Sequence, residues 1–460
     1  MNAPSREAAI ARALAFFDEG GFQARLAELV AIPSTSQDAG HEADLHRYLA
    51  DAIRPWLERM GFTVALHPNP SLGFGPILTA ERIEGAGPTV LTYGHGDTVR
   101  GLAEQWRPGL DPWTLTEAGD RWYGRGAADN KGQHALNLSA LEAVLAERGR
   151  LGFNLKLVLE MAEERGSQGL RAFIAAQANA LRADVLIASD GPRVASDTPT
   201  ISTGTRGTFH FDLVVDVRPG GVHSGNWGGM TTDPAIVLAH ALAAIADRQG
   251  RILVPGWLPR GGMPASVRDA LAGLELRAEG EAAAIDTGWG EPGFTVAEKI
   301  YGWTSFIVLA LLSGRPENPV NAVAPNARAH CQLRYTVDCD PAEFAPALRS
   351  HLDAAGFPEV AVEHAAVRMA ASRTDPANPW VRRVADSLAR TLGRPPQIIP
   401  NSGGGLPGDV FIDYLGVPLV WIPHSYNGCK QHGPDEHLLI APAREGIAAF
   451  AGLWWDLGEG

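Results

Sequence analysis

Cysteine, basic charge and long apolar runs are all scarce in this chain. The 460 residues include only three cysteines, Cys331, Cys339 and Cys429, and no Cys-x-x-Cys pair. Neither a disulfide framework nor a thiolate zinc site is therefore indicated. Acidic residues outnumber basic ones by 52 to 39, which gives a net charge of −13. Such a charge repels a phosphate backbone, so we do not expect nucleic acid as a partner.

No segment approaches the roughly 20 uninterrupted apolar residues that a membrane-spanning helix needs. At the amino terminus, Arg6, Glu7 and Arg12 interrupt the apolar residues, so this segment predicts an amphipathic helix and not a signal peptide. We therefore expect no membrane partner and a cytoplasmic location. The composition, 45% hydrophobic and 20% charged, is typical of a globular protein.

Apolar periodicity in the first part of the chain predicts helices and strands in alternation. Strands are expected at 64–66, 77–78, 90–93, 153–159 and 185–187, and helices at 45–60 and 132–145. This alternation is typical of an α/β sheet with helices on both faces. In such sheets, ligands bind beyond the carboxyl ends of the strands.

The pattern changes near residue 200, which predicts a second domain. Segments 205–217 and 327–337 alternate as strands, and each leads toward a helix-like run. We expect a smaller α+β domain at 200–372, inserted into a catalytic domain that is built from 1–199 and 373–460. A chain of this length is sufficient for two domains, because single cores stop growing at roughly 250–300 residues.

Five potential metal ligands are scattered along the chain, four of them where a predicted strand gives way to a loop. They are His95 in YGHGDTV, Asp129 in GRGAADNKG, Glu164 in EMAEERGS, Asp190 in IASDGP and His432 in QHGPDEH. Two histidines and three carboxylates suit one or two cations such as zinc. Glu163 provides the additional carboxylate that metal-assisted hydrolysis needs as a proton carrier. This combination predicts a metallohydrolase.

The order of these motifs resembles that of the co-catalytic zinc peptidases, which include aminoacylase, glutamate carboxypeptidase, succinyl-diaminopimelate desuccinylase and the carnosinase-type dipeptidases. The family order is H-x-D, G-x-x-D-N/M-K-G, E-E-x-G-S, D and H-x-x-x-E, and the match covers nearly the whole chain. The YGHGD sequence around His95 and the long 200–372 segment favour the carnosinase-like branch. The resemblance implies a zinc-exopeptidase-type mixed sheet flanked by helices, with an inserted α+β lid that also forms a homodimer.

Two divalent metal ions are implied by the same resemblance, with zinc favoured and manganese or cobalt as alternatives. Asp129 would bridge the two ions. His95 and Asp190 would complete one site, and Glu164 and His432 would complete the other. One histidine and two carboxylates in each site suit these cations.

The resemblance also assigns roles around the metals. Glu163 is expected to take a proton from water and to pass it to the leaving nitrogen. Asp97 is expected to accept the second N–H of the His95 ring, which would fix the orientation of that ring. In the family the peptide bond after the bridging aspartate is often cis, which here is the bond between Asp129 and Asn130.

Substrate contacts are implied in the predicted lid and in a glycine loop. His223 in VHSGNWGG matches a lid histidine that reaches the partner subunit's active site and hydrogen-bonds the carbonyl oxygen. Arg334 in CQLRY matches a lid arginine that binds a substrate carboxylate, a task suited to a planar guanidinium. Asn321 falls where relatives place a polar residue near the oxyanion. Gly404 and Gly405 belong to the loop GGGLP, where carnosinase-type enzymes read R-E-G-G-S-I-P.

The expected function is hydrolysis of the amide bond in small substrates with a free carboxylate, either dipeptides or N-acyl amino acids. Asn401 replaces the arginine of the carnosinase-type loop and Gly405 replaces its serine, which weighs against carnosine-like dipeptides. Two alternatives remain open: an amidohydrolase of non-peptide C–N bonds, such as those of N-carbamoyl compounds, and a non-catalytic metal-binding dimer. Glu163 weighs against the second alternative, because binding alone does not need a further, non-ligating carboxylate.

Overall fold

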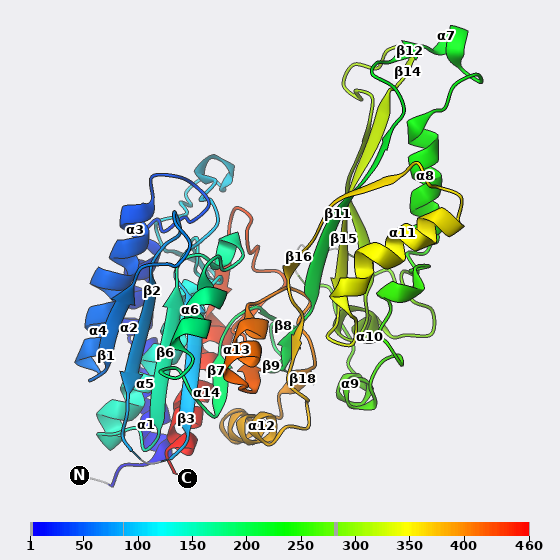
Figure 1. The fold of residues 1–460 in the computed structure, drawn as a ribbon. Coiled ribbons are helices and arrows are strands. Elements are labelled where there is room, and N and C mark those ends of the chain that lie inside the picture. Colours follow the sequence, from blue (N-terminus) through cyan, green and yellow to red (C-terminus); the bar gives the residue numbers. More distant parts are fainter. Residues whose placement is uncertain (1–2, 86, 280–283, 460) are drawn as a thin grey trace.

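Two β-sheets organise the fold, one in a larger body and one in a smaller, elongated body (Figure 1). The computed structural model describes residues 3–85, 87–279 and 284–459. Both chain termini lie in the larger body, where the carboxyl-terminal part of the chain packs beside the amino-terminal part. The smaller body comes from the middle of the chain.

An eight-stranded mixed sheet forms the centre of the larger body, in the order β1-β2-β6-β3-β7-β19-β9-β18. The strands are β1 (Thr63–His67), β2 (Ile77–Arg82), β6 (Asn154–Glu160), β3 (Thr89–His95), β7 (Val185–Ala188), β19 (Leu419–Trp421), β9 (Thr200–Ser202) and β18 (Gln397–Ile399). Strand β3 runs parallel to β6 and β7, and β19 runs parallel to β7, whereas β1 and β2 are antiparallel to their neighbours. This arrangement confirms the predicted mixed sheet.

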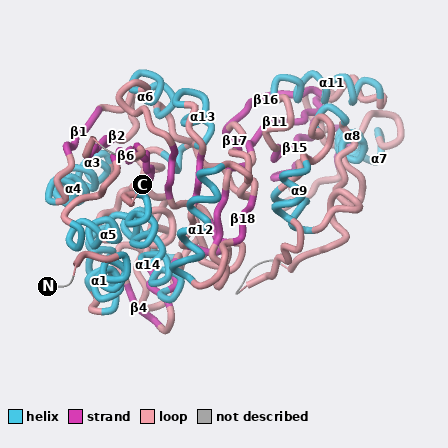
Figure 2. The backbone as a smooth tube through the Cα atoms, turned by 90° about the horizontal axis from the view of Figure 1, so that it is seen from below, coloured by secondary structure: helices cyan, strands magenta, loops and turns pink. Residues whose placement is uncertain are grey.

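Helices cover both faces of this sheet (Figure 2). One hydrophobic core joins the sheet to α1 (Arg6–Asp18), α2 (Gly21–Val30), α3 (Glu42–Arg47), α4 (Arg54–Arg59), α5 (Lys131–Arg148), α12 (Pro379–Leu392) and α14 (Ile440–Leu457). A second core on the opposite face joins the sheet to α6 (Leu170–Gln177) and α13 (Gly408–Leu415). Helix α5 packs against α1, α14 and the sheet, which buries its whole first half. The helix therefore presents its amino-terminal end at a fixed point beside the sheet.

A four-stranded antiparallel sheet forms the smaller body, in the order β13-β15-β11-β16. The strands are β13 (Ser305–Ser313), β15 (Asn326–Tyr335), β11 (Gly207–Asp216) and β16 (Ala361–Met369). Alternate side chains such as Phe209, Phe211 and Leu213 pack on α8 (Pro234–Ile245) and α11 (Phe344–Ala354). The polar residues between them therefore face the other side of the sheet.

Shorter elements complete the chain. They are α9 (Ala265–Leu271) and α10 (Val296–Tyr301), the pairs β4 (Thr116–Ala118) with β5 (Arg121–Tyr123), β5 with β21 (His437–Leu439), β8 (Pro192–Arg193) with β20 (Ser425–Tyr426), and β10 (Gly204–Thr205) with β17 (Ser372–Arg373). A small two-stranded sheet of β12 (Val222–His223) and β14 (Ala322–Val323), with α7 (Ser224–Trp227), lies at the end of the smaller body that points away from the larger one (Figure 1). Among the described residues, no helix has the length and hydropathy needed to cross a bilayer.

Candidate metal centre

The predicted metal ligands meet at one edge of the eight-stranded sheet. His95 is the last residue of β3, Asp190 follows β7, and Glu164 lies in a short 3-10 helix after β6. These three strands run in parallel, so their carboxyl ends lie at the same edge. Asp129 comes from the loop that leads into α5. Four distant segments of the sequence thus converge on one place.

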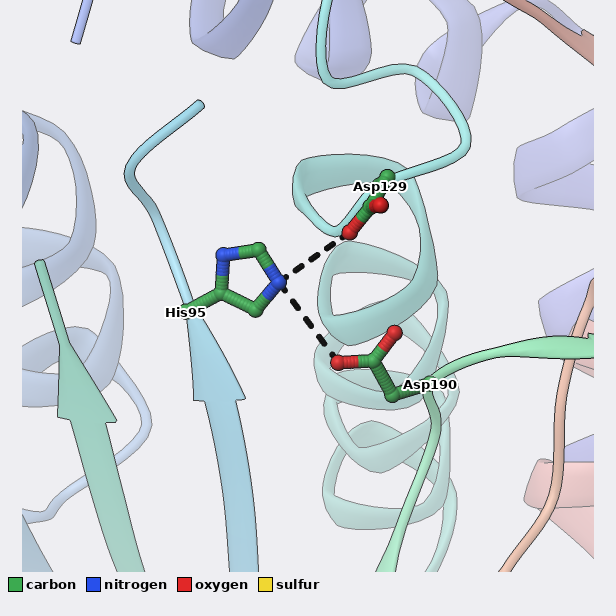
Figure 3. Close-up of side chains that lie close together, drawn as sticks. All are labelled: His95, Asp129 and Asp190. Atoms are coloured by element: carbon green, nitrogen blue, oxygen red, sulfur yellow. Dashed lines mark hydrogen bonds and ion pairs between the residues drawn. The ribbon is translucent and has the colours of Figure 1, made fainter. Parts of the chain in front are cut away.

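One potential ligand group consists of His95, Asp129 and Asp190 (Figure 3). The His95 Nε2 atom lies 3.1 Å from Asp129 Oδ1 and 3.5 Å from Asp190 Oδ2. Apart from this 3.5 Å contact with the His95 ring, Asp190 Oδ2 is buried without a hydrogen-bond partner among the described residues. A buried carboxylate oxygen without a donor is costly, and a cation would satisfy it.

A second potential ligand group consists of Asp129, Glu164 and His432. His432 Nε2 lies 3.2 Å from Asp129 Oδ2 and 3.1 Å from Glu164 Oε2. Asp129 therefore offers one carboxylate oxygen to each group. The peptide bond between Asp129 and Asn130 is cis, as the resemblance implied.

The carboxylates of Asp129, Glu163, Glu164 and Asp190 lie close together in this buried site. Their burial and their contacts shift the pKa values of several groups. Burial raises the pKa of Glu163 well above its usual value, and it raises the pKa of Glu164 to about 7. Hydrogen bonds to Asp129 and Glu164 raise the pKa of His432 to about 11. Crowded, desolvated carboxylates need protons or cations to neutralise them. Two divalent cations that prefer imidazole and carboxylate ligands fit this donor set.

Asp97 connects the His95 segment to the two adjacent glutamates. Its carboxylate accepts the backbone N–H groups of Glu163 and Glu164, each at 3.2 Å, and the hydroxyl of Ser36 at 2.6 Å. His95 Nδ1 lies 3.1 Å from the backbone oxygen of Asp97 and 3.4 Å from its carboxylate. The contact expected at the ring is therefore divided between the carbonyl and the carboxylate, and Asp97 also holds the glutamate turn in place.

Glu436 organises the loop before Asp129, a role that our interpretation of the sequence missed. Its carboxylate accepts from Arg125 Nη1 at 2.6 Å and from the backbone N–H groups of Gly126, Ala128 and Asp129 at 3.0–3.1 Å. The carboxylate and the guanidinium are almost fully buried. The final glutamate of the H-x-x-x-E motif was the signal that could have indicated it.

A cavity of about 460 Å³ lies over the metal-ligand cluster. Its lining also includes Thr208, His210, Gln332, Arg334, Met369, Gly404 and Gly405. The structure thus brings three of the predicted substrate-binding residues, Arg334, Gly404 and Gly405, to the same cavity as Glu163. Within the described part of the chain, the guanidinium of Arg334 makes one hydrogen bond, from Nε to Gln332 Oε1. Its two terminal nitrogens remain available to a ligand.

His223 and Asn321 lie away from this cavity. His223 belongs to the two-stranded β12–β14 sheet, and the Ser224 N–H beside it donates to the Asn321 carbonyl oxygen at 3.0 Å. The β12–β14 sheet is at the far end of the smaller body (Figure 1), and the His223 and Asn321 side chains are exposed. Neither residue lines the cavity formed by its own chain.

The structure shows the surroundings of Asn401 and Gly405, the two residues that differ from the carnosinase-type loop. Asn401 is buried, and its Nδ2 donates to the backbone oxygen of Tyr301 at 2.7 Å. A Cβ atom added at Gly405 would lie 2.1 Å from Met369 Sδ. The Met369 side chain therefore occupies the space that a serine at position 405 would need.

Comparison with known proteins gives the family. A family model described as peptidase family M20/M25/M40 matches residues 91–456, which is most of the chain. The chain belongs to this family. The resemblance drawn from the motifs is therefore confirmed, together with the enzyme class that it implied.

Relatives of this M20 peptidase include dipeptidases. It is 32% identical over 397 residues to a cysteinylglycine-S-conjugate dipeptidase of Corynebacterium striatum, which covers 83% of each chain. It is 34% identical over 251 residues to the Beta-Ala-His dipeptidase of Homo sapiens, which covers 51% of this chain and 48% of the relative. The second match agrees with the predicted carnosinase-like branch.

Solved structures of similar fold confirm the fold class. Dug1p of Saccharomyces cerevisiae, described as a dipeptidase, superposes with a TM-score of 0.80 at 20% identity, and the match covers 100% of both chains. Human carnosine dipeptidase 1 gives 0.80 at 23% identity and the same coverage. The metallo-carboxypeptidase Sso-CP2 of Sulfolobus solfataricus gives 0.77 at 25% identity and covers 95% of this chain and 99% of the other.

Proposed function

We propose that this M20 peptidase is a two-metal hydrolase of the amide bond in small substrates with a free carboxylate, with dipeptides as the first candidates. The observation that carries the proposal is the pair of ligand groups that share Asp129, with Glu163 beside them and Arg334 on the facing wall. The names of the relatives, which include several dipeptidases, support the same substrate class.

The proposed metal ligands are His95, Asp129 and Asp190 for one ion and Asp129, Glu164 and His432 for the other. When bound, the two ions supply Lewis-acid chemistry, because they polarise the scissile carbonyl and make water more acidic. We propose zinc, with manganese or cobalt as alternatives, since all three accept mixed imidazole and carboxylate ligands.

Glu163 is the proposed proton carrier. Its carboxylate lies 3.9 Å from His95 Nε2, and burial raises its pKa well above the usual value. A carboxylate of raised pKa is a stronger base, so Glu163 accepts a proton from the attacking water and then donates it to the leaving nitrogen. Asp97 keeps Glu163 in place through the backbone N–H group of that residue.

Arg334 is the proposed binder of the substrate carboxylate. Its side chain lines the cavity, and its terminal nitrogens are free of hydrogen bonds to the described residues. A planar guanidinium can hold a carboxylate through two parallel hydrogen bonds. Such a contact would fix the end of the substrate and place the preceding amide bond over the metal-ligand cluster.

We also propose that the enzyme is a homodimer formed through the smaller body. Strand β13 is at the edge of its sheet, and Val308, Leu309, Leu311 and Leu312 are 39%, 49%, 59% and 57% exposed. An exposed, apolar edge strand is a template for pairing with another chain. A second copy of β13, related by two-fold symmetry, would cover these residues.

This arrangement supports the domain division predicted from the sequence, with 200–372 as lid and dimerisation domain and 1–199 with 373–460 as catalytic domain. The β12–β14 sheet, which carries His223 and is preceded by Asn321, lies at the far end of the smaller body. We propose that it reaches the active site of the partner subunit, where His223 donates a hydrogen bond to the carbonyl oxygen that becomes negatively charged.

Substrates with a blocked amino group are the second candidates, and one feature of the cavity lining fits them. Apart from the metal-ligand cluster and Glu163, the described residues that line the cavity include no carboxylate to pair with a substrate ammonium group. N-acyl and N-carbamoyl amino acids lack this ammonium group and keep the carboxylate for Arg334. An isosteric pair of substrates, with and without the free amino group, distinguishes the two candidates.

The test is a substrate panel with controlled metal content. The protein is stripped with a chelator and reloaded with Zn²⁺, Mn²⁺ or Co²⁺, and then assayed on dipeptides, N-acyl amino acids and N-carbamoyl amino acids. We expect metal-dependent hydrolysis of at least one carboxylate-bearing class. Binding of two metals without hydrolysis of any substrate would instead support the non-catalytic dimer.

A further inference from the structure

Two neutral side chains, Gln332 and His210, form a hydrogen-bond chain that ends at the Arg334 guanidinium. Arg334 and Gln332 lie on β15, and His210 lies opposite Gln332 on β11. Arg334 Nε donates to Gln332 Oε1 at 3.0 Å, and Gln332 Nε2 lies 2.9 Å from His210 Nε2. All three side chains line the cavity over the metal-ligand cluster.

The chemistry of the three groups allows only one arrangement of donors and acceptors. A guanidinium has no acceptor, so Gln332 must turn its oxygen toward Arg334. The Gln332 amide nitrogen then faces His210 Nε2, which must accept a hydrogen bond. His210 is therefore neutral and carries its proton on Nδ1.

We propose that Gln332 and His210 are positioning residues for substrate recognition, which hold the Arg334 guanidinium in the plane that receives the substrate carboxylate. The proposal rests on the proposed function, in which Arg334 binds that carboxylate. The proposed role needs no contact between either residue and the reacting amide. Both act through Arg334, so their contribution is to substrate affinity and to the selection of carboxylate-bearing substrates.

The neutral character of Gln332 is central to this role. A glutamate at the same position would neutralise the guanidinium and compete with the substrate carboxylate. Gln332 restrains Arg334 without reducing its charge, and Arg334 forms no ion pair within the described residues. A restrained arginine loses less freedom when the substrate binds, which improves affinity.

His210 lies among positively charged groups, which favours its neutral form. Burial lowers its pKa below the usual value, and His330 and Arg334 on β15 and Arg368 on β16 lower it further. The His330 ring centroid is 5.6 Å away, and the carboxylate of Asp212 is hydrogen-bonded by His330. Carboxylates of the metal-ligand cluster stand across the same cavity.

Protonation of His210 would break the chain. A protonated ring has no acceptor at Nε2, so the neighbouring Gln332 amide must turn and present its nitrogen to Arg334, which is also a donor. The neutral form is present above the His210 pKa, which burial lowers from the usual value. KM for a carboxylate substrate should therefore rise as the pH falls through that pKa.

The test compares a dipeptide with the same dipeptide as its carboxy-terminal amide. Gln332→Met keeps the side-chain length and removes the acceptor. We expect KM for the dipeptide to rise about tenfold and kcat to stay within about twofold, while KM for the amide is unchanged. Gln249→Met, in an exposed turn of the smaller body, is the matched control and should leave KM unchanged for both substrates.

His210 variants provide an independent arm. His210→Gln keeps an acceptor without a titrating group, so KM should stay near the wild-type value and lose its rise at low pH. His210→Phe should raise the dipeptide KM at every pH. Equal effects on the dipeptide and its amide, or no effect in Gln332→Met and His210→Phe, would overturn the proposal.

Failure of the proposed function gives a different result. If the metal-loaded wild type hydrolyses neither compound, the proposed function fails, and the comparison moves to dissociation constants measured by calorimetry. The wild type should then bind the dipeptide more tightly than its amide, and Gln332→Met should remove that difference. An unchanged ratio would overturn the positioning role by itself.

Discussion

Single residues at the metal centre differ in role although they are close in sequence. Glu164 Oε2 lies 3.1 Å from His432 Nε2 and belongs to a ligand group, whereas Glu163 belongs to neither group. Both residues are glutamates in one short 3-10 helix. Their roles therefore differ because their side chains point in different directions. Substitution by the neutral isostere distinguishes a ligand from a proton carrier.

Glu163→Gln should abolish turnover without loss of metal. A positioned general base contributes about 10²–10⁴-fold to the rate, and the amide cannot replace it. We expect at least a hundredfold loss of kcat by this estimate, with the metal content of wild type by elemental analysis. Glu164→Gln is the matched variant, and it should lose metal. The reverse pattern of metal loss would exchange the two assignments.

Asp129 and Asp190 provide a second test at this scale. Asp129 offers an oxygen to both ligand groups, and Asp190 offers one to a single group. Asp129→Ala should therefore lose both metals, whereas Asp190→Ala should mainly weaken one site. Metal stoichiometry measured by titration checks this, with circular dichroism to confirm folding. A folded Asp129→Ala protein that still binds two metals would contradict the bridging role.

At the scale of elements, the loops that carry the ligands are fixed by a buried ion pair. Arg125 and Glu436 are each about 1% exposed, and Glu436 also accepts three backbone N–H groups of the loop before α5. Glu436→Ala should destabilise the fold by about 3–5 kcal/mol, because it leaves a buried charge unpaired. Denaturant unfolding of the metal-free protein measures this.

Glu58 provides the control for that experiment. It forms an exposed ion pair with Arg54 on α4, four residues apart. Exposed helix pairs of this kind contribute about 0.3–0.5 kcal/mol, so Glu58→Ala should hardly shift the unfolding midpoint. A similar loss of unfolding free energy in Glu436→Ala and Glu58→Ala would mean that Glu436 does not organise the loop.

Most of the elements could be predicted from local patterns, and the exceptions have physical reasons. Strands β3, β6, β11 and β15 lie where apolar residues were expected to form strands. The helix predicted at 45–60 is interrupted by a π-helical segment at Tyr48–Ile53, which ends two residues before Pro55, a residue that cannot donate a backbone hydrogen bond. Strand β13 was missed because its continuous apolar run has no period that distinguishes a strand from a helix.

The candidate site was predictable only where motifs carry it. The five ligands and Glu163 were predicted because their order matches the family, and the structure brings them together. The contacts of Glu436 with Arg125 and of Gln332 with His210 join segments far apart in the sequence. The second contact depends on the register between β11 and β15, which local sequence does not reveal.

At the scale of the whole molecule, the residue proposed to donate a hydrogen bond to the substrate carbonyl oxygen lies far from the metal-ligand cluster of its own chain. His223 lies at the far end of the smaller body, while the metal-ligand cluster lies at the edge of the large sheet (Figure 1). Symmetric pairing of two chains places the same patch of each chain against the other, so the β12–β14 sheet of each chain could serve the other subunit's site. This geometry predicts an active site composed of two chains.

Complementation between inactive subunits tests that prediction. His223→Ala and Glu163→Gln should each be nearly inactive alone. After equal mixing and subunit exchange, half of the dimers are heterodimers with one intact site each, so activity should recover to about a quarter of wild type per total site. The matched control is the His223→Ala/Glu163→Gln double variant exchanged with wild type. Its heterodimers have no intact site, so all remaining activity should come from the wild-type homodimers. Proven heterodimers without recovery would place His223 in its own subunit's site or outside the reaction.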